Sequence, residues 1–471
     1  MDYQEAHKKF RSIEDDLNLF DARIGDFAFW DYLRYPIWDQ ILAGCGLMDS
    51  VIGNGECRSF HQRVVGKLRT IKNALINSPV TAPKSEFVFI GGGARRRVLG
   101  SDGRFEDVWC DPLIDHLGGA RCQFWETSNA GNHDASYYQK RLSSLDLFER
   151  VASFSRIESK LGFLLSDSER TMLVAVEARI LEEFGLELDL QAQVESSLLR
   201  RKWALPLITF CLSRINPKAV FIVCSYFGRE IYVEACRKLR IPIIEIQHGT
   251  TSDYHLAYSY PEGASKETFP DYFLNFGVFW DKAVHLPISP ARIFTLGYPA
   301  IESKLGMVSE KKKQVVFVSQ KTISGNLWGF AVKLLEKLPP DWRIIYKLHP
   351  AESYDLMKPY CDERSARIEV VGVDGRSLHA LLAESPIQIG VYSTAVYEGI
   401  AMGCRTYLLS LPGVEYMKYL IELNYCQLVS SVEEVEFEFD ETVINTRRED
   451  FFSVDWGANF DRALGSMGIE P

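Results

Sequence analysis

Apolar runs of strand length alternate with helical patterns twice along the chain, and this alternation constrains the fold more than any other feature. The first set lies within 85–305, with strands expected just before Gly91 and at 219–226, 241–247, 272–277 and 293–299. The second set lies within 312–440, with strands expected at 314–320, 343–350, 367–372, 387–393 and 405–411. Alternating strands and helices form parallel βαβ units. We therefore predict an α/β protein with two tandem Rossmann-like, doubly wound domains that face a cleft.

The two ends of the chain lie outside this alternation. Residues 1–80 are rich in aromatics, and apolar residues recur at three- and four-residue steps from Phe20 to Ile41, which predicts a helical N-terminal extension. Pro36 is expected to kink or end that helix, because proline lacks a backbone amide proton. Residues 441–471 are expected to form a C-terminal tail that packs back on the body.

Charge and composition exclude several classes of protein. The net charge of −10 argues against a general nucleic-acid binder, which would carry a basic surface. The ten cysteines form no C-x-x-C pair and no zinc-type cluster with histidine, which is typical of free thiols in a reducing compartment. The charged segment 1–16 lacks a signal-peptide core, and no window approaches the roughly 18 apolar residues of a membrane span. We expect a cytoplasmic protein.

A basic stretch follows the aromatic segment. Its cations are Arg58, Arg63, Lys67, Arg69 and Lys72. One interpretation is that residues 20–75 contact anionic lipid at the inner face of the cytoplasmic membrane, as a peripheral protein does. The alternative is a solvated helix face joined to a linker.

The first candidate site is the exit of the strand in "IPIIEIQHGTTSDYH". Gln247, His248 and Gly249 follow the apolar run directly, with Asp253 and His255 close behind. In parallel α/β folds, ligands bind outside the carboxyl ends of the strands. A histidine there is either a general base or an ordinary residue at a strand exit.

Two further strand exits carry groups suited to phosphate. In "KLHPAES", Pro350 restricts the backbone of His349, whose imidazole can donate to a phosphate oxygen. In "GVYSTAVYEGIAMG", Ser393 and Thr394 begin a helix whose N-terminus suits an anion, and Glu398 is placed to accept from a ribose or base. The alternatives are a packing histidine and a plain N-cap followed by a surface glutamate.

The exit of "VFVSQKTISGNL" offers amide groups and a cation for a phosphate, through Ser319, Gln320, Lys321 and Gly325. It lacks the spacing of a P-loop, and the glycines Gly91, Gly92 and Gly93 lack that of a dinucleotide motif, although they could line the substrate cleft. No D-x-D pair occurs, so we expect neither a metal ion nor a cofactor at the site.

The order Gln247-His248-Gly249, "GYP", His349-Pro350 and Ser393-Thr394 with "YEG" resembles bacterial glycosyltransferases of the GT-B fold. The resemblance covers about 220–410 and is closest to capsular polysaccharide biosynthesis proteins and to CMP-sugar-using sialyl- and Kdo-transferases. The C-terminal half is also similar to CDP-glycerol glycerophosphotransferases. These families build capsule and lipopolysaccharide.

The resemblance implies roles for the two domains. Residues 85–305 would bind the acceptor and residues 312–440 the donor, whose nucleotide would be held by His349, Pro350, Ser393 and Thr394. The sialyltransferase type carries an acidic pair before a glycine, where this chain has Gln247-His248-Gly249. His248, Asp253 or His255 would therefore have to supply the base.

The predicted function is metal-independent glycosyl transfer from a nucleotide-sugar, with a CMP-sugar favoured, to a growing capsule or lipopolysaccharide glycan or glycolipid. Three alternatives stay open at this stage. They are a CDP-alditol phosphotransferase, a UDP-sugar 2-epimerase of the same fold, and a non-catalytic scaffold for capsule assembly.

Overall fold

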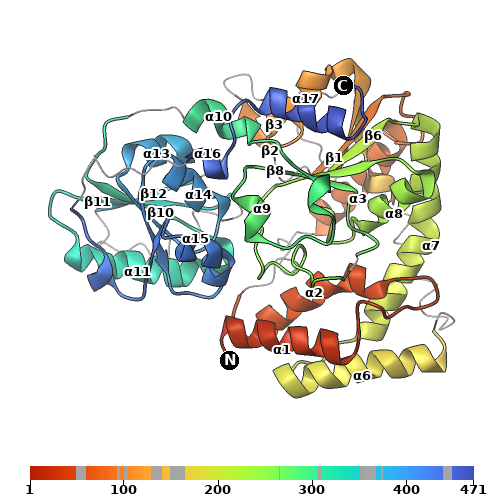
Figure 1. Ribbon diagram of the computed structural model, residues 1–471, viewed down its shortest axis with the longest axis horizontal. Coiled ribbons are helices and arrows are strands. Elements are labelled where there is room, and N and C mark those ends of the chain that lie inside the picture. Colours follow the sequence, from red (N-terminus) through yellow and green to blue (C-terminus); the bar gives the residue numbers. More distant parts are fainter. Residues whose placement is uncertain are drawn as a thin grey trace.

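The structure is a computed structural model of the 471-residue chain. It describes residues 1–48, 60–92, 96–99, 104–128, 141–148, 165–264, 266–305, 309–350, 352, 367–372, 375–438 and 448–471. Two α/β domains lie side by side, and a layer of helices from the N-terminal part of the chain covers the lower side of the larger domain in Figure 1. Gly93 and Arg58 lie outside the described residues.

Seven parallel strands form the sheet of the N-terminal domain, in the order β5-β4-β1-β6-β7-β8-β9. They are β1 (Phe87–Gly92), β4 (Cys122–Thr127), β5 (Leu142–Ser144), β6 (Ala219–Val223), β7 (Ile243–Ile246), β8 (Tyr272–Asn275) and β9 (Ile293–Thr295). The winding direction reverses between β1 and β6, which makes their carboxyl ends a topological switch point. A separate antiparallel pair joins β2 (Arg96–Leu99) to β3 (Arg104–Asp107).

Six parallel strands form the C-terminal sheet, in the order β12-β11-β10-β13-β14-β15. They are β10 (Gln314–Val318), β11 (Arg343–Lys347), β12 (Ile368–Val371), β13 (Ile387–Gly390), β14 (Arg405–Leu409) and β15 (Gln427–Val429). The reversal lies between β10 and β13. The two sheets confirm the predicted α/β fold with two doubly wound, Rossmann-like domains, the arrangement of the GT-B type.

Helices cover the faces of both sheets, so the central strands are buried on both sides and read as continuous apolar runs. The helices around the N-terminal sheet include α4 (Asp111–Leu117), α7 (Leu190–Ile215), α8 (Glu230–Leu239), α9 (Trp280–Ala283) and α10 (Pro299–Leu305). Those around the C-terminal sheet include α11 (Ser324–Lys337), α13 (Leu378–Glu384), α14 (Thr394–Ala401) and α15 (Lys418–Glu422).

The N-terminal segment is helical as predicted, and its helices α1 (Tyr3–Asp16) and α2 (Phe29–Gly44) pack with α6 (Asp167–Phe184) and α7. Of the two outcomes predicted at Pro36, an end of the helix is excluded, because α2 continues through it. Ile37 and Trp38 are fully buried just after the proline, so packing offsets the hydrogen bond that proline removes.

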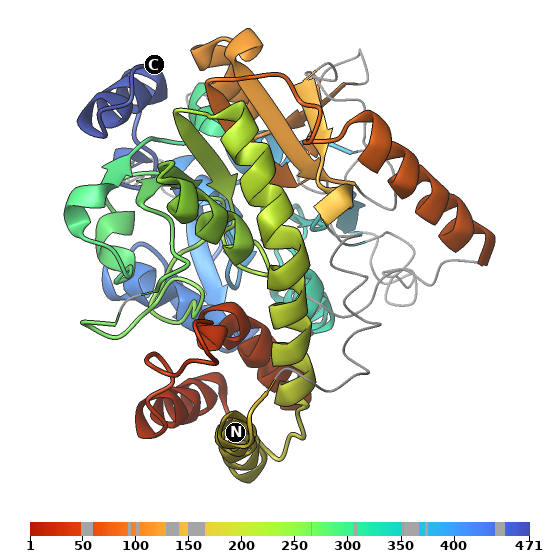
Figure 2. The same ribbon diagram turned by 90° about the vertical axis from the view of Figure 1, so that its right-hand side faces the viewer.

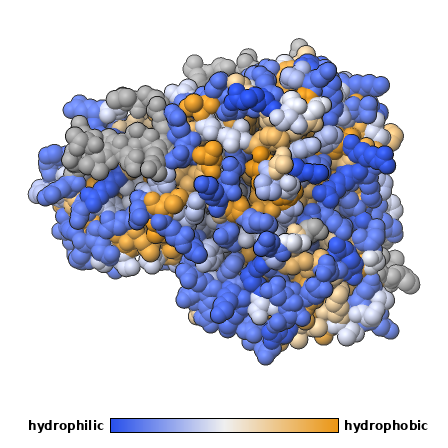
Figure 3. Space-filling model, viewed as in Figure 1, coloured by the Kyte–Doolittle hydropathy of each residue, from blue (hydrophilic) through white to orange (hydrophobic). Residues whose placement is uncertain are grey.

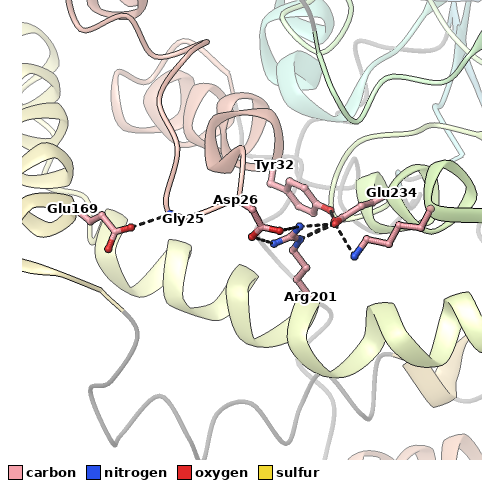
Figure 4. Close-up of polar contacts among 7 residues, drawn as sticks. Gly25, Asp26, Tyr32, Glu169, Arg201 and Glu234 are labelled. Atoms are coloured by element: carbon pink, nitrogen blue, oxygen red, sulfur yellow. Dashed lines mark hydrogen bonds and ion pairs between the residues drawn. The ribbon is translucent and has the colours of Figure 1, made fainter.

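A branched ion-pair network ties this helical layer to the N-terminal domain (Figure 4). The Arg201 guanidinium on α7 donates to Asp26 at 2.8 and 3.0 Å and to Glu234 on α8 at 2.6 Å. Tyr32 on α2 also donates to Glu234, at 3.0 Å. One guanidinium therefore joins the loop before α2 to two helices of the α/β domain.

The C-terminal residues return to the N-terminal domain. After α16 (Arg448–Phe451), α17 (Trp456–Ser466) lies across the top of that domain in Figure 1 and buries Phe460 and Leu464 in its core beside Phe221. Gly297 permits the close approach, because a Cβ there would lie 2.5 Å from the Ser453 carbonyl oxygen and its φ is +99°.

The surface is mixed in character. In Figure 3, hydrophobic side chains gather over the middle of the face, where the two domains meet, while the outer parts are largely hydrophilic. Within the described ranges, no helix is both long enough and apolar enough to cross a bilayer.

Candidate active site at the domain junction

The loop after β7 is anchored by its first residue. Gln247 is fully buried, accepts from the Phe276 amide at 2.9 Å and donates to the Gly249 carbonyl at 3.0 Å. These bonds fix the strand exit and leave Gln247 a structural part of the loop. A Cβ at Gly249 would meet open space, so neither packing nor backbone conformation requires glycine at this position.

His248 sits between two tyrosine hydroxyls. Its Nδ1 lies 3.3 Å from the Tyr258 hydroxyl, and its Nε2 lies 3.4 Å from the Tyr226 hydroxyl. Tyr258 donates its own proton to Glu245 at 2.7 Å, so its oxygen is left as an acceptor toward Nδ1. This arrangement favours the tautomer with hydrogen on Nδ1 and a lone pair on Nε2, the atom needed for a base. Catalytic hydrogen bonds are often this long without substrate.

Glu245 is the buried acid beneath this histidine. It lies in the middle of β7, is fully shielded from solvent, and burial raises the pKa of its carboxyl above the usual range. The Ser225 amide lies 3.3 Å from Oε1, which also accepts from Tyr258. Glu245 therefore orients Tyr258, which in turn positions the imidazole of His248.

The loop after β6 supplies Tyr226 through strained backbone. Cys224 and Phe227, on either side, have φ angles of +68° and +58°, in the left-handed region that side chains rarely adopt. Each such residue costs on the order of 1–3 kcal/mol and persists where the surroundings enforce it, often at functional sites. Here the strain directs the Tyr226 hydroxyl between His248 and His255, from which it lies 3.4 and 3.5 Å.

His255 lies in an aromatic cage. Its ring stacks on Tyr35 with centroids 5.1 Å apart and planes 6° apart, and Tyr258 lies 4.9 Å away. Burial lowers the pKa of His255 to about 4, so the ring is neutral at neutral pH. Its Nδ1 is buried and has no hydrogen-bond partner in the described part of the chain. Such a weak base suits positioning better than proton transfer, which favours His248 for that role.

Asp253 has its contacts elsewhere, with His285 and Lys418. It is exposed, and its carboxylate lies against the His285 backbone amide and near Lys418 of the C-terminal domain. Gly249 is followed by Thr250, Thr251 and Ser252. Their side-chain hydroxyls are buried and have no hydrogen-bond partner among the described residues.

The N-terminal helices brace this loop from outside. Arg34 on α2 is fully buried, pairs with Glu14 on α1 at 2.5 Å, and donates to the Leu256 and Ser259 carbonyls, the latter at 2.7 Å. A buried guanidinium thus holds the segment that carries His255 and Tyr258. The aromatic N-terminal segment therefore supports the candidate site directly.

In the C-terminal domain, two strand exits meet at the switch point. Gln320 after β10 accepts from the Tyr392 amide after β13, at 3.1 Å. Ser319 is buried and lies 3.0 Å from Glu352, whose other oxygen accepts from the His349 amide at 2.7 Å. The predicted donor residues of β10, β11 and β13 are thus brought together, while the Ser319 hydroxyl itself is engaged internally.

The remaining residues of this group differ in what they offer a ligand. Lys321, His349, Pro350 and Gly325 are exposed. Ser393 is the N-cap of α14 and accepts from the Ala395 amide at 3.2 Å, while Thr394 opens the helix.

Glu398 was predicted to face a ribose or base. It is instead buried, with Oε2 2.9 Å from the His379 ring on α13. A donor group could reach it only beside that ring.

The glycines after β1 pack tightly. A Cβ on Gly91 would lie 2.6 Å from Asp107 and 2.8 Å from Phe124, and the Gly91 carbonyl accepts from Arg229 at 3.3 Å. Gly91 therefore serves close packing at the switch point. Gly92 ends β1, next to it.

Tyr416 joins the two groups of residues. This tyrosine of the C-terminal domain packs on His255 with centroids 5.7 Å apart and on Tyr392 at 5.4 Å. Its hydroxyl accepts from Tyr3 of α1 at 2.9 Å. The strand exits predicted to hold the base and the donor nucleotide therefore meet across one aromatic contact, with α1 beside it.

No family model matches the chain, and no curated protein matches it. Among solved structures, it is similar to a Staphylococcus aureus MnaA–UDP complex, at 12% identity over 82% of this chain and 99% of that one, with a TM-score of 0.47. It is also similar to a Neisseria meningitidis UDP-GlcNAc 2-epimerase bound to UDP-GlcNAc, at 13% identity over 80% of this chain and 99% of that one, with a TM-score of 0.46. A third similar structure is the glycosyltransferase SnogD from Streptomyces nogalater, at 13% identity over 82% of this chain and 96% of that one, with a TM-score of 0.43.

A separate open groove of about 750 Å³ lies along α7 beside the end of α8. Leu205, Phe210 and Leu239 line it together with Lys202 and Lys238. It contains none of the predicted site residues. Within the described chain, no group of three or more His, Cys, Asp or Glu side chains is placed to bind a metal ion.

Three residues of the site were not predicted from the sequence: Glu245, Tyr258 and Tyr226. Glu245 had a readable signal, because a single acid inside the apolar run "IPIIEIQ" must be buried and needs a partner. The two tyrosines had none, since aromatic residues are frequent throughout this chain and only the fold brings these two to His248.

Proposed function

We propose that this protein transfers a glycosyl group from a nucleotide-activated sugar to an acceptor hydroxyl, with His248 as the base. The observation that carries the proposal is the contact between two different strand-exit sites. Glu245, Tyr258 and His248 form a chain that presents Nε2. His255, which packs on Tyr258, contacts Tyr416, and Tyr416 contacts Tyr392 at the exit of β13. A proton acceptor and a phosphate site at one junction suit glycosyl transfer.

The chemistry assigns one task to each side. The acceptor hydroxyl gives its proton to Nε2 of His248 as its oxygen bonds to the anomeric carbon. The bond from that carbon to the phosphate oxygen breaks, and the nucleotide leaves with the electron pair. Lys321, His349 and the amides that open α14 offset the charge that develops on the leaving phosphate. Attack from the face opposite the leaving group inverts the anomeric configuration.

The resemblance to capsule and lipopolysaccharide enzymes supports the finer assignment. It favours a CMP-sugar as donor and a growing surface glycan or glycolipid as acceptor. No acidic pair stands before Gly249, and His248 takes that place in the proposal.

The test begins with the nucleotide. Thermal-shift measurements with CMP, CDP, UMP, UDP and GDP, in EDTA, should show stabilisation by one nucleotide class, because a ligand that binds only the folded state raises the melting temperature. The matching donor is then incubated with candidate glycan acceptors, and products are identified by mass spectrometry. Loss of turnover in EDTA would contradict the metal-independent mechanism.

The same assay separates the alternatives. A UDP-sugar altered at C2 without any acceptor identifies a 2-epimerase, which NMR of the donor alone detects. Release of CMP from a CDP-alditol identifies a phosphotransferase. A chain that binds none of the five nucleotides would overturn the proposal and favour a scaffold.

A further inference from the structure

Helix α3 (Phe60–Ile76) exposes an apolar surface that no other helix of the described chain matches in density. Leu68, Ile71, Leu75 and Ile76 are 62%, 48%, 73% and 63% exposed. Residues 68, 71 and 75 recur at three- and four-residue steps, so they share one face of the helix. A surface helix of a globular protein normally turns such a stripe toward the core.

The charge around this helix is opposite to that of the whole protein. Residues 57–85 contain no Asp or Glu and six Lys or Arg residues, in a chain whose net charge is −10. Arg69 and Lys72 are exposed on α3 itself, next to the apolar positions. An apolar face flanked by cations is the pattern of helices that lie in the interface of anionic membranes.

We propose that α3 docks on an anionic lipid surface, with Leu68, Ile71 and Leu75 buried at the boundary of headgroups and acyl chains. Lys and Arg near an anionic leaflet add electrostatic attraction, which a neutral protein surface would not supply. In a symmetric dimer built on this face, α3 would lie against the same cationic helix of the second copy, so the charge of α3 favours an anionic membrane over such a dimer.

The position of α3 is compatible with docking. Figure 2 shows it along the outer edge of the N-terminal domain, with one end directed away from the body. Its 17 residues correspond to a length of about 25 Å.

The sequence predicted a membrane contact through 20–75, and the structure narrows it. Ile37 and Trp38 of α2 are fully buried, so that helix has no comparable face to offer. The proposed contact is confined to α3.

Co-sedimentation with vesicles tests the proposal without any enzymatic readout, so its result is independent of the proposed function. The full chain is mixed with vesicles of phosphatidylcholine alone or with added phosphatidylglycerol. We expect binding to the anionic vesicles only, weakened by salt because the attraction is partly electrostatic. Equal sedimentation with both compositions, or none with either, would overturn the proposal.

Two double variants separate the apolar and electrostatic contributions. Leu68→Ser with Leu75→Ser, and Arg69→Glu with Lys72→Glu, should each lower vesicle binding more than about tenfold. All four side chains are exposed, so the fold should be retained, which circular dichroism can verify.

Matched controls lie on other helices. Val174→Ser with Leu181→Ser removes two residues of α6 that are 57% and 46% exposed, and Lys8→Glu with Lys333→Glu makes the same change in net charge elsewhere. These variants should bind vesicles like the unmodified chain. If they lose binding equally, or if the α3 variants change only the oligomeric state in light scattering, the docking assignment is wrong.

Discussion

The two halves of the candidate site differ in how they treat charge. Around His248, the titratable groups are buried, and the pKa values of Glu245 and Tyr258 are raised by burial while that of His255 is lowered. Around β10 and β11, the side chains of Lys321 and His349 are exposed. Burial tunes groups that move protons, whereas exposure keeps a cation charged for an anionic ligand. The contrast supports a division into a proton-transfer side and a phosphate side.

The largest expected effect on the rate comes from removing the proposed base. His248→Ala should lower the rate of glycosyl transfer by about 10²–10⁴-fold and leave nucleotide binding intact, because the base acts only on the acceptor. Initial rates and a nucleotide titration measure the two effects. Turnover within a few-fold of the unmodified chain would assign the base elsewhere.

A milder variant tests the positioning of that base. Tyr258→Phe keeps the ring but removes the hydroxyl that contacts Nδ1. It should lower kcat with little change in KM for the donor, and shift the pH–rate profile. If the variant loses stability but keeps its kcat and its pH–rate profile, Tyr258 contributes only to packing.

The cage around His255 predicts a dependence of stability on acid. Its pKa is about 4 in the folded state, against about 6.5 when unfolded. Between these values the unfolded chain binds more protons, so lowering the pH costs stability, by about 3 kcal/mol in all. His255→Phe should lack this loss and gain relative to the unmodified chain as pH falls from 6.5 to 4. Urea unfolding at several pH values measures the difference, and parallel curves would contradict it.

For Glu230, which is buried at the start of α8, we expect stability to change with pH in the opposite direction. Burial raises the pKa of its carboxyl to about 7, above the value of about 4.5 expected when unfolded. Between these values the folded chain holds the extra proton, so stability is lost as pH rises. Glu230→Gln should therefore gain relative to the unmodified chain as pH rises from 4.5 to 7, by about 3 kcal/mol in all. A gain toward acid pH instead would refute the assignment.

On the proposed phosphate side, a smaller effect is expected from a single imidazole. His349→Ala should weaken nucleotide binding by about tenfold, since a hydrogen bond to a charged group contributes about 1.5–3 kcal/mol. His116→Ala is a control, because His116 pairs with Asp461 of α17 and is not one of the candidate site residues. Calorimetric titration compares the two variants, and unchanged affinity in both would remove His349 from the site.

The smallest effect concerns the contact between the two sides. Tyr3→Phe removes only the hydrogen bond to Tyr416 and should lower the free energy of unfolding by about 0.5–1.5 kcal/mol. Denaturant unfolding measures it. A larger loss would show that α1 bears more of the junction than one hydrogen bond.

The fold was readable from the sequence because its central strands are buried on both faces. Such strands give uninterrupted apolar runs, as in β6 and β10, and each lies inside its predicted range. β4 was missed, since "CQFWET" mixes polar and aromatic residues, although its first five positions are buried. Its polar members, Gln123 and Glu126, face partners that only the fold supplies.

The candidate site was only half readable. His248, His349 and Ser393 could be predicted because they follow strands of a parallel sheet, and the exits of such strands share one edge of the sheet. The sequence could not show that Glu398 lies against His379, or that Tyr416 joins the two domains. Those contacts join segments far apart in the chain, where residue spacing carries no information.

The return of the chain to its first domain limits how this protein can be taken apart. A fragment ending at residue 305 would contain every strand of the N-terminal sheet yet lack α17, leaving Phe221 and its neighbours without Phe460 and Leu464. For domain exchange or a split reporter, the natural unit of the N-terminal half is therefore discontinuous. Any chimera that grafts a new C-terminal α/β domain between β9 and α16 must carry residues 448–471 along with the N-terminal half.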